Sequence, residues 1–403
     1  MKKSVVVLSV LGACSYAAQA QTNVVVYGLL DSGVTYVNKI ATPTAGNPRG
    51  AGSRFSVDSG DLQQSRFGFK GVEDLGGGMK ALFNLEGGFS VDTGASGQGG
   101  LVFGRTSTVG LSGNYGTVQL GRRKDFIDEV ATYYSSVYDF GVFINGVHDN
   151  NLDRVGGNRA NNQIRYDTPL LKGLVLNATY GFGETAGSTS TGQSLGFGAN
   201  YANGPFGIGF GYWQSKLGTL SGGVNTSSDQ GTTLGAGCTP SYGHPGDTCI
   251  KTWMLGSSYK AGAWRVFGAW SKVLQPLATY GGNQAPLAAK FVGAAGASPF
   301  AAGGSNNNST NVFDLGVNYS ISDSLHLVSS VLQSRYSFVG SSTKGRLTQV
   351  NLGLDYAFSK RTDLYSYVAN LRASDMYNPG ITGGAPGADN SQTAFTVGLR
   401  HKF

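Results

Sequence analysis

The side chains that could do acid–base or metal chemistry are few and scattered along this 403-residue chain. The four histidines are His148, His244, His326 and His401. They show no spacing typical of metal ligands, and no nucleophile motif accompanies them. Asp128 and Glu129 are adjacent, but catalytic carboxylates need partners in a defined constellation. We therefore expect no enzyme, no metal site and no cofactor.

The first residues have the features of an export signal. Lys2 and Lys3 precede an apolar run over 5–13, and Ala18-Gln19-Ala20 supplies small residues for cleavage. This predicts a signal peptide over residues 1–20 and a mature region over 21–403. Leu11-Gly12-Ala13-Cys14 also fits a lipoprotein acylation site, although the signal would then be unusually short.

Cysteine usage is consistent with export. Cys14 lies in the signal, which leaves Cys238 and Cys249 in a polar segment rich in Gly, Thr and Pro. In an oxidising compartment two thiols ordinarily pair, so we expect a disulfide between Cys238 and Cys249 within one surface loop. Catalysis or metal binding by these cysteines is the minor alternative.

The composition is unusual for a soluble protein of this size. Charged residues make up only 13% of the chain, hydrophobic residues 40%, and there are 64 glycines. Soluble surfaces normally carry more charge. The net charge is +7, or +5 without Lys2 and Lys3. We find no basic run and no nucleic-acid motif, so we expect no nucleic-acid partner, and a mild bias toward anions fits the excess better.

The elements that must position any functional residue are strands of alternating polarity. In 313–319 and 350–358 every second residue is large and apolar, and the residues between are polar or glycine except for Ala357. The segments 174–182 and 195–201 repeat this pattern, which places apolar and polar side chains on opposite faces. From Val24 onward we find no convincing helical period and no run of eighteen apolar residues.

Three further features favour a membrane barrel over a soluble sandwich. Short turns at 73–78, 112–116 and 321–324 alternate with long polar connections at 39–61, 217–249 and 275–311. Aromatic residues lie near strand ends, as in interfacial girdles; they are Tyr27, Tyr36, Tyr166, Tyr180, Trp213, Tyr319 and Tyr356. The chain stops on a strand whose last residue is Phe403. We therefore predict an all-β fold, a single-domain transmembrane antiparallel β-barrel of about sixteen strands.

Alternation also predicts which charges face the lumen. Phe67 and Phe69 would contact lipid, so Arg66 and Lys70 would point inward. On the next strand the same argument places Lys80 and Glu86 inside, and further along it places Arg165 inside. Selectivity of a barrel depends on such lumen charges and on whatever narrows the lumen.

Several segments make the resemblance to a known family specific. They are SRFGFKGVEDLGGGMKALFNLEGGF, FGRTSTVGLSGNYGTVQLGR, NQIRYDTP, LDYAFSKRTDLY and the closing VGLRHKF. In this order they resemble the general porins of β-proteobacteria over nearly the whole mature chain. The resemblance implies a sixteen-stranded homotrimeric barrel whose third loop folds inward to form a constriction, often anion-selective.

The resemblance also implies a basic ladder at the constriction. Its arginines would be Arg66, Arg122 and Arg165, with Arg123 and Arg159 as close contenders and Lys70 and Lys80 adding charge. Opposing acids would be Glu86 and residues of the third loop, expected at about 123–158. That loop carries Asp125, Asp128, Glu129, Asp139, Asp149 and Asp153, of which we select Asp125 and Asp139. The Pro-Glu-Phe-Gly motif of enterobacterial relatives is missing, and each arginine could instead be plainly solvated or tied to a loop carboxylate.

The expected function is therefore passive diffusion of small hydrophilic solutes and ions, preferably anions, through a water-filled channel. The expected location is the outer membrane of a Gram-negative bacterium, crossed many times. Expected partners are outer-membrane lipid, lipopolysaccharide and two further copies of the chain. A substrate-specific channel for phosphate or an organic acid, and a surface adhesin that forms no channel, are the alternatives.

Overall fold

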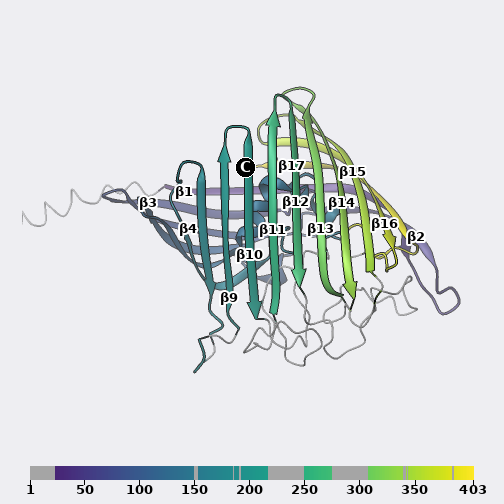
Figure 1. The fold of residues 1–403 in the computed structure, drawn as a ribbon. Helices are drawn as coiled ribbons and strands as arrows, with labels where there is room; N and C mark the ends of the chain where they lie inside the picture. The colour runs from purple at the N-terminus through teal and green to yellow at the C-terminus, as the bar shows by residue number, and fades with distance from the viewer. Residues whose placement is uncertain are drawn as a thin grey trace, which may run out of the picture.

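A computed structural model of the chain shows a large antiparallel β-barrel (Figure 1). It describes residues 23–148, 153–184, 186–189, 192–216, 249–274, 307–338, 342, 344–383 and 385–403. The strands are β1 Asn23–Ala41, β2 Ala51–Ser59, β3 Arg66–Gly76, β4 Met79–Gly88, β5 Thr106–Gly113, β6 Gly116–Lys124, β7 Arg159–Asp167, β8 Leu174–Gly181, β9 Ser194–Asn203, β10 Phe206–Lys216, β11 Cys249–Ala261, β12 Trp264–Leu274, β13 Asn307–Ser320, β14 Leu325–Phe338, β15 Lys344–Ala357, β16 Thr362–Ser374 and β17 Ser391–Lys402. The described helices are η1 Gln98–Gly100, α2 Phe126–Tyr134, α3 Val137–Phe140 and η2 Gly141–Ile144.

The first and last strands close the barrel. Residues 29–37 of β1 pair with residues 394–402 of β17. On its other side β1 pairs with β2 over residues 32–41 and with β3 over residues 23–29. Since β2 and β3 share one position in the wall, the seventeen described strands make a barrel of sixteen positions. The predicted fold class is confirmed.

The break between β2 and β3 turns the chain into the lumen. Two buried acids bind this segment to the wall. Asp61 accepts hydrogen bonds from Thr35 (2.7 Å) and Thr396 (2.8 Å). Asp31 accepts one from the backbone N–H of Gln63 at 2.9 Å. Since buried carboxylates need such donors, these contacts stabilise the inward bend.

The prediction of one long polar connection over residues 39–61 was wrong in part. The strand β1 continues to Ala41, and β2 occupies residues 51–59. Within β2 the outward Phe55 and Val57 alternate with polar residues, and Phe55 packs against Tyr36 with 4.7 Å between ring centroids. The alternating pattern of a strand was present in the sequence of β2, but only two large apolar residues formed it.

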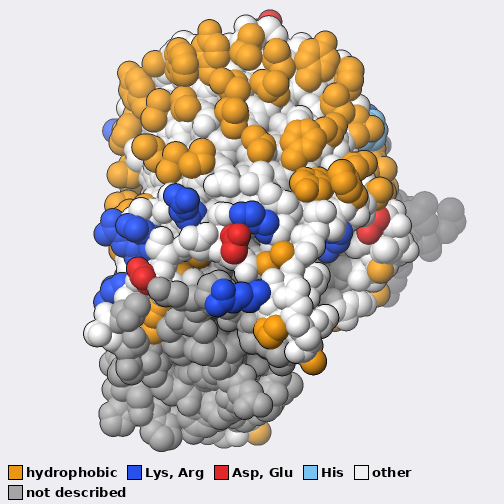
Figure 2. Space-filling view, turned by 90° about the vertical axis from the view of Figure 1, so that its right-hand side faces the viewer, with side chains coloured by type: hydrophobic (Ala, Val, Ile, Leu, Met, Phe, Trp, Pro, Cys, Tyr) orange, Lys and Arg blue, Asp and Glu red, His pale blue; other side chains and the backbone are white. Residues whose placement is uncertain are grey.

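The wall is apolar outside, as the alternation predicted. On β13 the side chains of Phe313 and Leu315 are exposed, whereas Asp314 between them is 4% exposed and faces inward. Figure 2 shows hydrophobic side chains gathered over the upper part of one face of the barrel. Two of the aromatics assigned to the girdles were placed wrongly, because Tyr27 lines a lumen cavity and Trp213 is fully buried against Arg154.

The third loop, between β6 and β7, lies inside the barrel. Its helix α2 packs on a patch of the inner wall where β9, β10 and β11 carry glycine. A side-chain carbon at Gly198 would lie 2.1 Å from the Phe126 ring, and one at Gly256 would lie 2.5 Å from Cβ of Tyr134. Only glycine leaves room for a helix so close to the strands. The sequence analysis predicted no helix here.

The far part of this loop is bound to the opposite wall. Ser136 donates two hydrogen bonds to Asp314 (2.6 and 2.8 Å), and Gln349 donates one to the carbonyl of Phe143 at 2.6 Å. In the part of the loop that leads back to β7, Nδ1 of His148 lies 2.6 Å from the Asp153 carboxylate. Burial opposes protonation of His148, but the Asp153 carboxylate outweighs it and raises the pKa of the imidazole. The main hydrophobic core of the described residues therefore lies inside the barrel, between the loop and the wall.

Within the described ranges no helix is both long and apolar enough to cross a bilayer.

Candidate functional site

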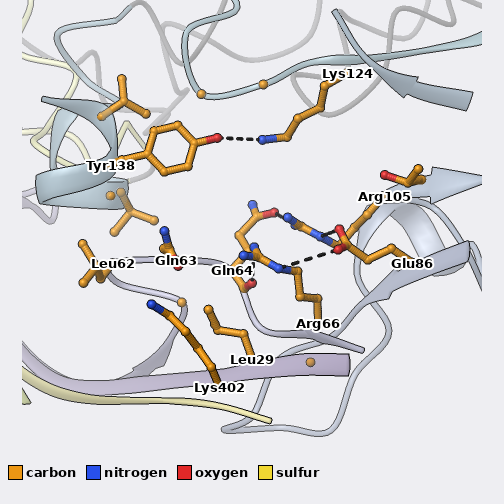
Figure 3. Close-up of a pocket in the computed structure, with 18 of the residues that line it drawn as sticks. Leu29, Leu62, Gln63, Gln64, Arg66, Glu86, Arg105, Lys124, Tyr138 and Lys402 are labelled. Carbon is orange, nitrogen blue, oxygen red and sulfur yellow. Dashed lines mark hydrogen bonds and ion pairs between the residues drawn. The ribbon is translucent and has the colours of Figure 1, made fainter. Parts of the chain in front are cut away.

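A polar cavity of about 560 Å³ lies in the lumen between the third loop and the wall (Figure 3). One side is formed by β1, β3, β4 and the start of β5, and the other by residues 137–145 and 156–157 of the loop. Five basic residues and one acid contribute to its lining. They are Arg66, Arg105, Lys124, Arg159, Lys402 and Glu86. The cavity is therefore strongly electropositive.

Glu86 is the only acid in this lining, and neighbouring groups compensate its charge. Arg105 Nε lies 2.7 Å from Oε1 of Glu86, and Arg66 Nε lies 3.7 Å from Oε2. The Tyr27 hydroxyl donates to the same carboxylate at 3.0 Å. Arg105 also donates to Gln64 at 2.6 Å, which fixes its guanidinium against the inward segment between β2 and β3. Two arginines thus share one carboxylate.

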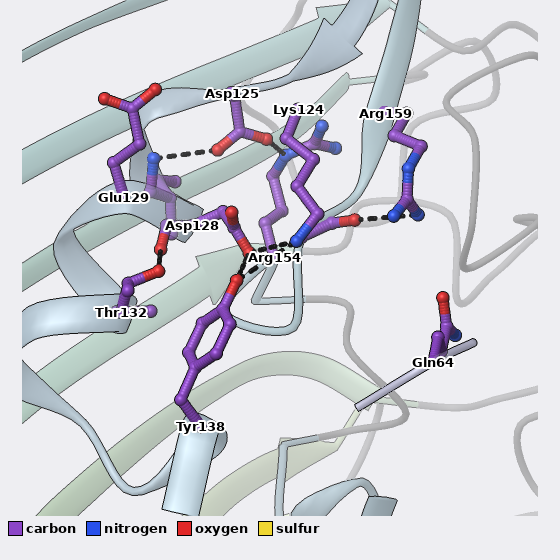
Figure 4. A network of polar contacts seen from close by, with 12 residues as sticks. Gln64, Lys124, Asp125, Asp128, Glu129, Thr132, Tyr138, Arg154 and Arg159 are labelled. Carbon is purple, nitrogen blue, oxygen red and sulfur yellow. Dashed lines mark hydrogen bonds and ion pairs between the residues drawn. The ribbon is translucent and has the colours of Figure 1, made fainter. Parts of the chain in front are cut away.

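Lys124, at the end of β6, faces the cavity from the loop side (Figures 3 and 4). Its ammonium lies 2.7 Å from the Asp128 carboxylate and 3.1 Å from the Tyr138 hydroxyl. Tyr138 in turn donates to Asp128 at 2.9 Å. Burial, together with the Asp128 charge, raises the pKa of Tyr138 well above its ordinary value. The phenol therefore remains a neutral donor at the cavity wall.

Arg159 lines the cavity and has no carboxylate partner among the described residues. Its Nε donates to the carbonyl of Arg105 at 3.1 Å and its Nη1 to the carbonyl of Gly157 at 3.3 Å. The side chain is 3% exposed. No carboxylate of a described residue pairs with this guanidinium, so its charge adds to the positive potential of the cavity.

Two of the arginines proposed for the ladder bind the loop. Arg165 contacts Glu129 of α2 at 2.6 Å and Asp167 at 2.5 Å, and its guanidinium lies over the Phe126 ring. Arg123 contacts Glu129 at 3.2 Å. Neither belongs to the cavity lining. Their positions match the structural alternative of the sequence analysis, in which an arginine is tied to a loop carboxylate.

Asp125 also serves the loop rather than the cavity. Its carboxylate accepts the backbone N–H of Ile127 at 2.8 Å and so caps the N-terminus of α2. The same carboxylate pairs with Arg154, whose guanidinium stacks 4.5 Å from the Trp213 ring. Figure 4 shows this group beside, but separate from, the contacts of Lys124.

Arg122 does not belong to the cavity lining either. Alternation from the outward Leu120 would place it on the lipid face, but the pairing of β6 with β7 shifts register between Gly121 and Arg123. The side chain is buried there, and its Nε donates to the carbonyl of Gly104 at 2.7 Å. Its assignment to the ladder depended on resemblance, and the bond to Gly104 gives it a structural role beside the cavity.

The remaining predicted residues lie away from the cavity. Lys70 lies over the Tyr27 ring at 5.1 Å, and Lys80 pairs in register with Asp74 near the short-turn end. Asp139 lines a second cavity of about 310 Å³ near that end, where Asn318 donates to it at 3.2 Å. Burial raises the pKa of Asp139 to about 6.

Arg105, Lys124 and Lys402 were not selected from the sequence. Arg105 precedes β5, and Lys124 and Lys402 end their strands, so alternation says little about their directions. The proposed disulfide depends on Cys238, which is outside the described residues, as are residues 1–20 and Asp149.

Comparisons with known proteins agree with the barrel fold. The family model described as Gram-negative porin matches residues 7–376. The chain is 32% identical to outer membrane porin protein 32 of Delftia acidovorans, with all of both chains covered. It is 27% identical to an outer membrane porin protein of Bordetella pertussis, again over both full lengths.

A solved structure gives the same result. The anion-selective porin from Comamonas acidovorans matches with a TM-score of 0.66 and 26% identity, covering 95% of this chain and all of that one. The chain belongs to the Gram-negative porins. It is a multi-pass β-barrel protein of the Gram-negative outer membrane, in a family of channels rather than enzymes.

Proposed function

We propose that this porin lets small hydrophilic solutes diffuse through its lumen and prefers anions at the cavity beside the third loop. The observation that carries the proposal is the balance of charge there: five basic side chains and one acid line the cavity, and one further carboxylate, Asp128, pairs with Lys124. Glu86 already has two arginine partners, and Arg159 has no carboxylate partner among the described residues. In a narrow low-dielectric passage such a surplus attracts anions and repels cations.

The similarity to the anion-selective porin from Comamonas acidovorans supports the same preference. We assign Arg66, Arg105 and Arg159 as the cations that set selectivity, with Lys402 contributing from the wall. Lys124 contributes less, because Asp128 of the loop pairs with it. Arg123, Arg165 and Asp125 are assigned to positioning the loop.

The test is the reversal potential of the refolded protein in a planar bilayer under a KCl gradient. The wild type should give a chloride-favouring potential. Arg159→Gln and Arg105→Gln should each lower the chloride-to-potassium permeability ratio by at least about threefold, because each removes one unit of charge from a weakly screened site. Arg361→Gln, in the exposed turn after β15, is the matched control and should change nothing.

A potassium-favouring potential in the wild type, or an unchanged ratio in both lumen variants, would contradict the anion preference. Absence of any conductance from folded protein would contradict the channel itself.

We also propose a homotrimer, a signal peptide over residues 1–20, and a disulfide between Cys238 and Cys249. Stepwise conductance in groups of three and chemical cross-linking would test the trimer. Mass spectrometry of the protein from outer membranes would test both the mature N-terminus and the disulfide.

A further inference from the structure

The second cavity, of about 310 Å³, lies beside the third loop near the short-turn end of the barrel. The helix α3 contributes to both cavities, since Tyr138 lines the first and the next residue, Asp139, lines the second. The wall of the second cavity comes from β11 to β15, around the two short turns that follow β11 and β13. Small-molecule sites have volumes of about 300–1,000 Å³, so this cavity is large enough for a compact solute.

The lining of the second cavity carries charges of both signs that do not neutralise each other. Its acids are Asp139 and Asp355, and its permanent cations are Lys260 and Arg265. Among the described residues, no ion pair joins either cation to either acid. In the first cavity, by contrast, the single acid is paired with arginine. Opposite charges that line one cavity without pairing leave both signs available to a solute.

The two acids have weak partners of their own. The neutral amide of Asn318 donates to both carboxylate oxygens of Asp139 at 3.2 Å. Asp355 lies 3.7 Å from Arg400, whose guanidinium is held more closely, at 3.0 Å, by Asp363. The buried Oδ1 of Asp355 has no hydrogen-bond partner. Since a partly buried carboxylate is stabilised by a charged donor, these two acids form the half of the cavity that suits an ammonium group.

The two cations form the other half of the cavity. Lys260 on β11 pairs in register with Arg265 on β12, and both line the cavity. Like charges directly opposite each other on one face of a sheet are destabilising, so a carboxylate bound between them offsets this cost. The guanidinium of Arg265 lies 4.7 Å from the centre of the Phe267 ring and donates to the carbonyl of Tyr133. These contacts orient it and leave further donors for a solute carboxylate.

We propose that the second cavity binds zwitterionic α-amino acids. The solute carboxylate binds between Lys260 and Arg265, and the solute ammonium, with its three donors, binds to Asp139 and Asp355. A solute with only a carboxylate leaves the two acids without a charged partner, and a solute with only an ammonium leaves the two cations opposed. This proposal rests on the channel of the proposed function but not on its anion preference.

The experiment measures dissociation constants by NMR titration of the full-length porin in detergent, at about pH 7.5, above the pKa of about 6 that burial gives Asp139. The probe is L-alanine. L-lactate, in which a hydroxyl replaces the ammonium, and L-alaninamide, in which a neutral amide replaces the carboxylate, are the matched solutes. Asp139→Asn and Asp355→Asn should each weaken alanine binding at least about fivefold without weakening lactate binding, because each removes an acceptor for the ammonium. Arg265→Gln should weaken alanine binding by a similar factor without weakening alaninamide binding.

Asp323→Asn and Arg361→Gln, in exposed short turns outside the cavity lining, are the matched controls and should bind alanine like the wild type. Single-channel conductance in KCl checks that each variant has folded. Alanine binding within about twofold of the wild type in all three cavity variants would overturn the proposal, as would an equal loss of alanine and lactate binding in both acid variants. A wild type that binds no alanine but has a chloride-favouring potential would overturn this inference alone. A potassium-favouring potential with intact alanine binding would overturn only the anion preference.

Discussion

Two groups of arginines lie inside the barrel, and they differ in what surrounds them. Arg66, Arg105 and Arg159 line the cavity. Arg66 and Arg105 share the carboxylate of Glu86, and Arg159 donates to neutral carbonyls. Arg154 and Arg165 are each paired with a carboxylate of the third loop. The residue type is the same, but only the first group leaves charge for a solute. Under the proposed function, the position of the nearest carboxylate decides whether an arginine selects ions or holds the loop.

Removing a loop-binding arginine should have the largest effect on stability. Arg165→Ala leaves Asp167 and Glu129 without their closest cation. We expect the free energy of unfolding to fall by about 3 kcal/mol. This is the lower end of the range for a buried ion pair, because Glu129 is partly exposed. Thermal unfolding in detergent measures it, with Arg361→Ala as the control. A loss below about 1 kcal/mol would remove the distinction between the groups.

Substituting a glycine on the strands that α2 packs against should have the next largest effect on stability. Gly256→Ala places a methyl group 2.5 Å from Cβ of Tyr134, so the helix or strand must shift. We expect overpacking to lower the free energy of unfolding by about 1–2 kcal/mol. We also expect the conductance to change. Gly268→Ala on β12, where the nearest atom would be 3.6 Å away, is the control and should behave like the wild type.

A pH effect of smaller size should come from Asp139. Burial raises its pKa to about 6 from an ordinary value of 3.8, with Arg265 and Asn318 opposing the shift and Asp314 and Asp355 adding to it. The folded protein thus binds this proton more tightly than the unfolded chain, so stability rises as pH falls through 6 and levels off below about 4. Between pH 8 and pH 5 the unfolding temperature of the wild type should therefore include a rise caused by protonation of Asp139. This contribution should be absent in Asp139→Asn. An unchanged pH profile in the variant would contradict the assignment.

Substituting a cavity arginine should have the smallest effect on stability. Arg159→Gln breaks no ion pair with a described residue and retains a donor for the Arg105 carbonyl. We expect an unfolding free energy within about 1 kcal/mol of the wild type, consistent with the loss of one hydrogen bond. Its reversal potential should nevertheless shift, as proposed above. A variant that lost stability without changing selectivity would move Arg159 into the loop-binding group.

Alternation along strands was enough to predict the barrel and the inward direction of Arg66 and Glu86. It failed where residues leave the strands. Arg105 precedes β5, and its place in the cavity depends on Gln64 and Glu86 from other segments. The helix α2 is only nine residues long, and its docking depends on glycines more than sixty residues away in sequence. Its cap, Asp125 before acidic Asp128 and Glu129, was a local signal that could have been used.

The seam between β1 and β17 sets the order of events during biogenesis. Its pairs join residues separated by more than 350 positions, such as Val37 and Ala394. Contacts this distant in sequence form slowly, because the chain between them must first be ordered. A growing barrel therefore presents two open edges until its last strand arrives, and open edges readily pair with other chains. Shielding of these two edges until β17 pairs with β1 would therefore prevent such pairing.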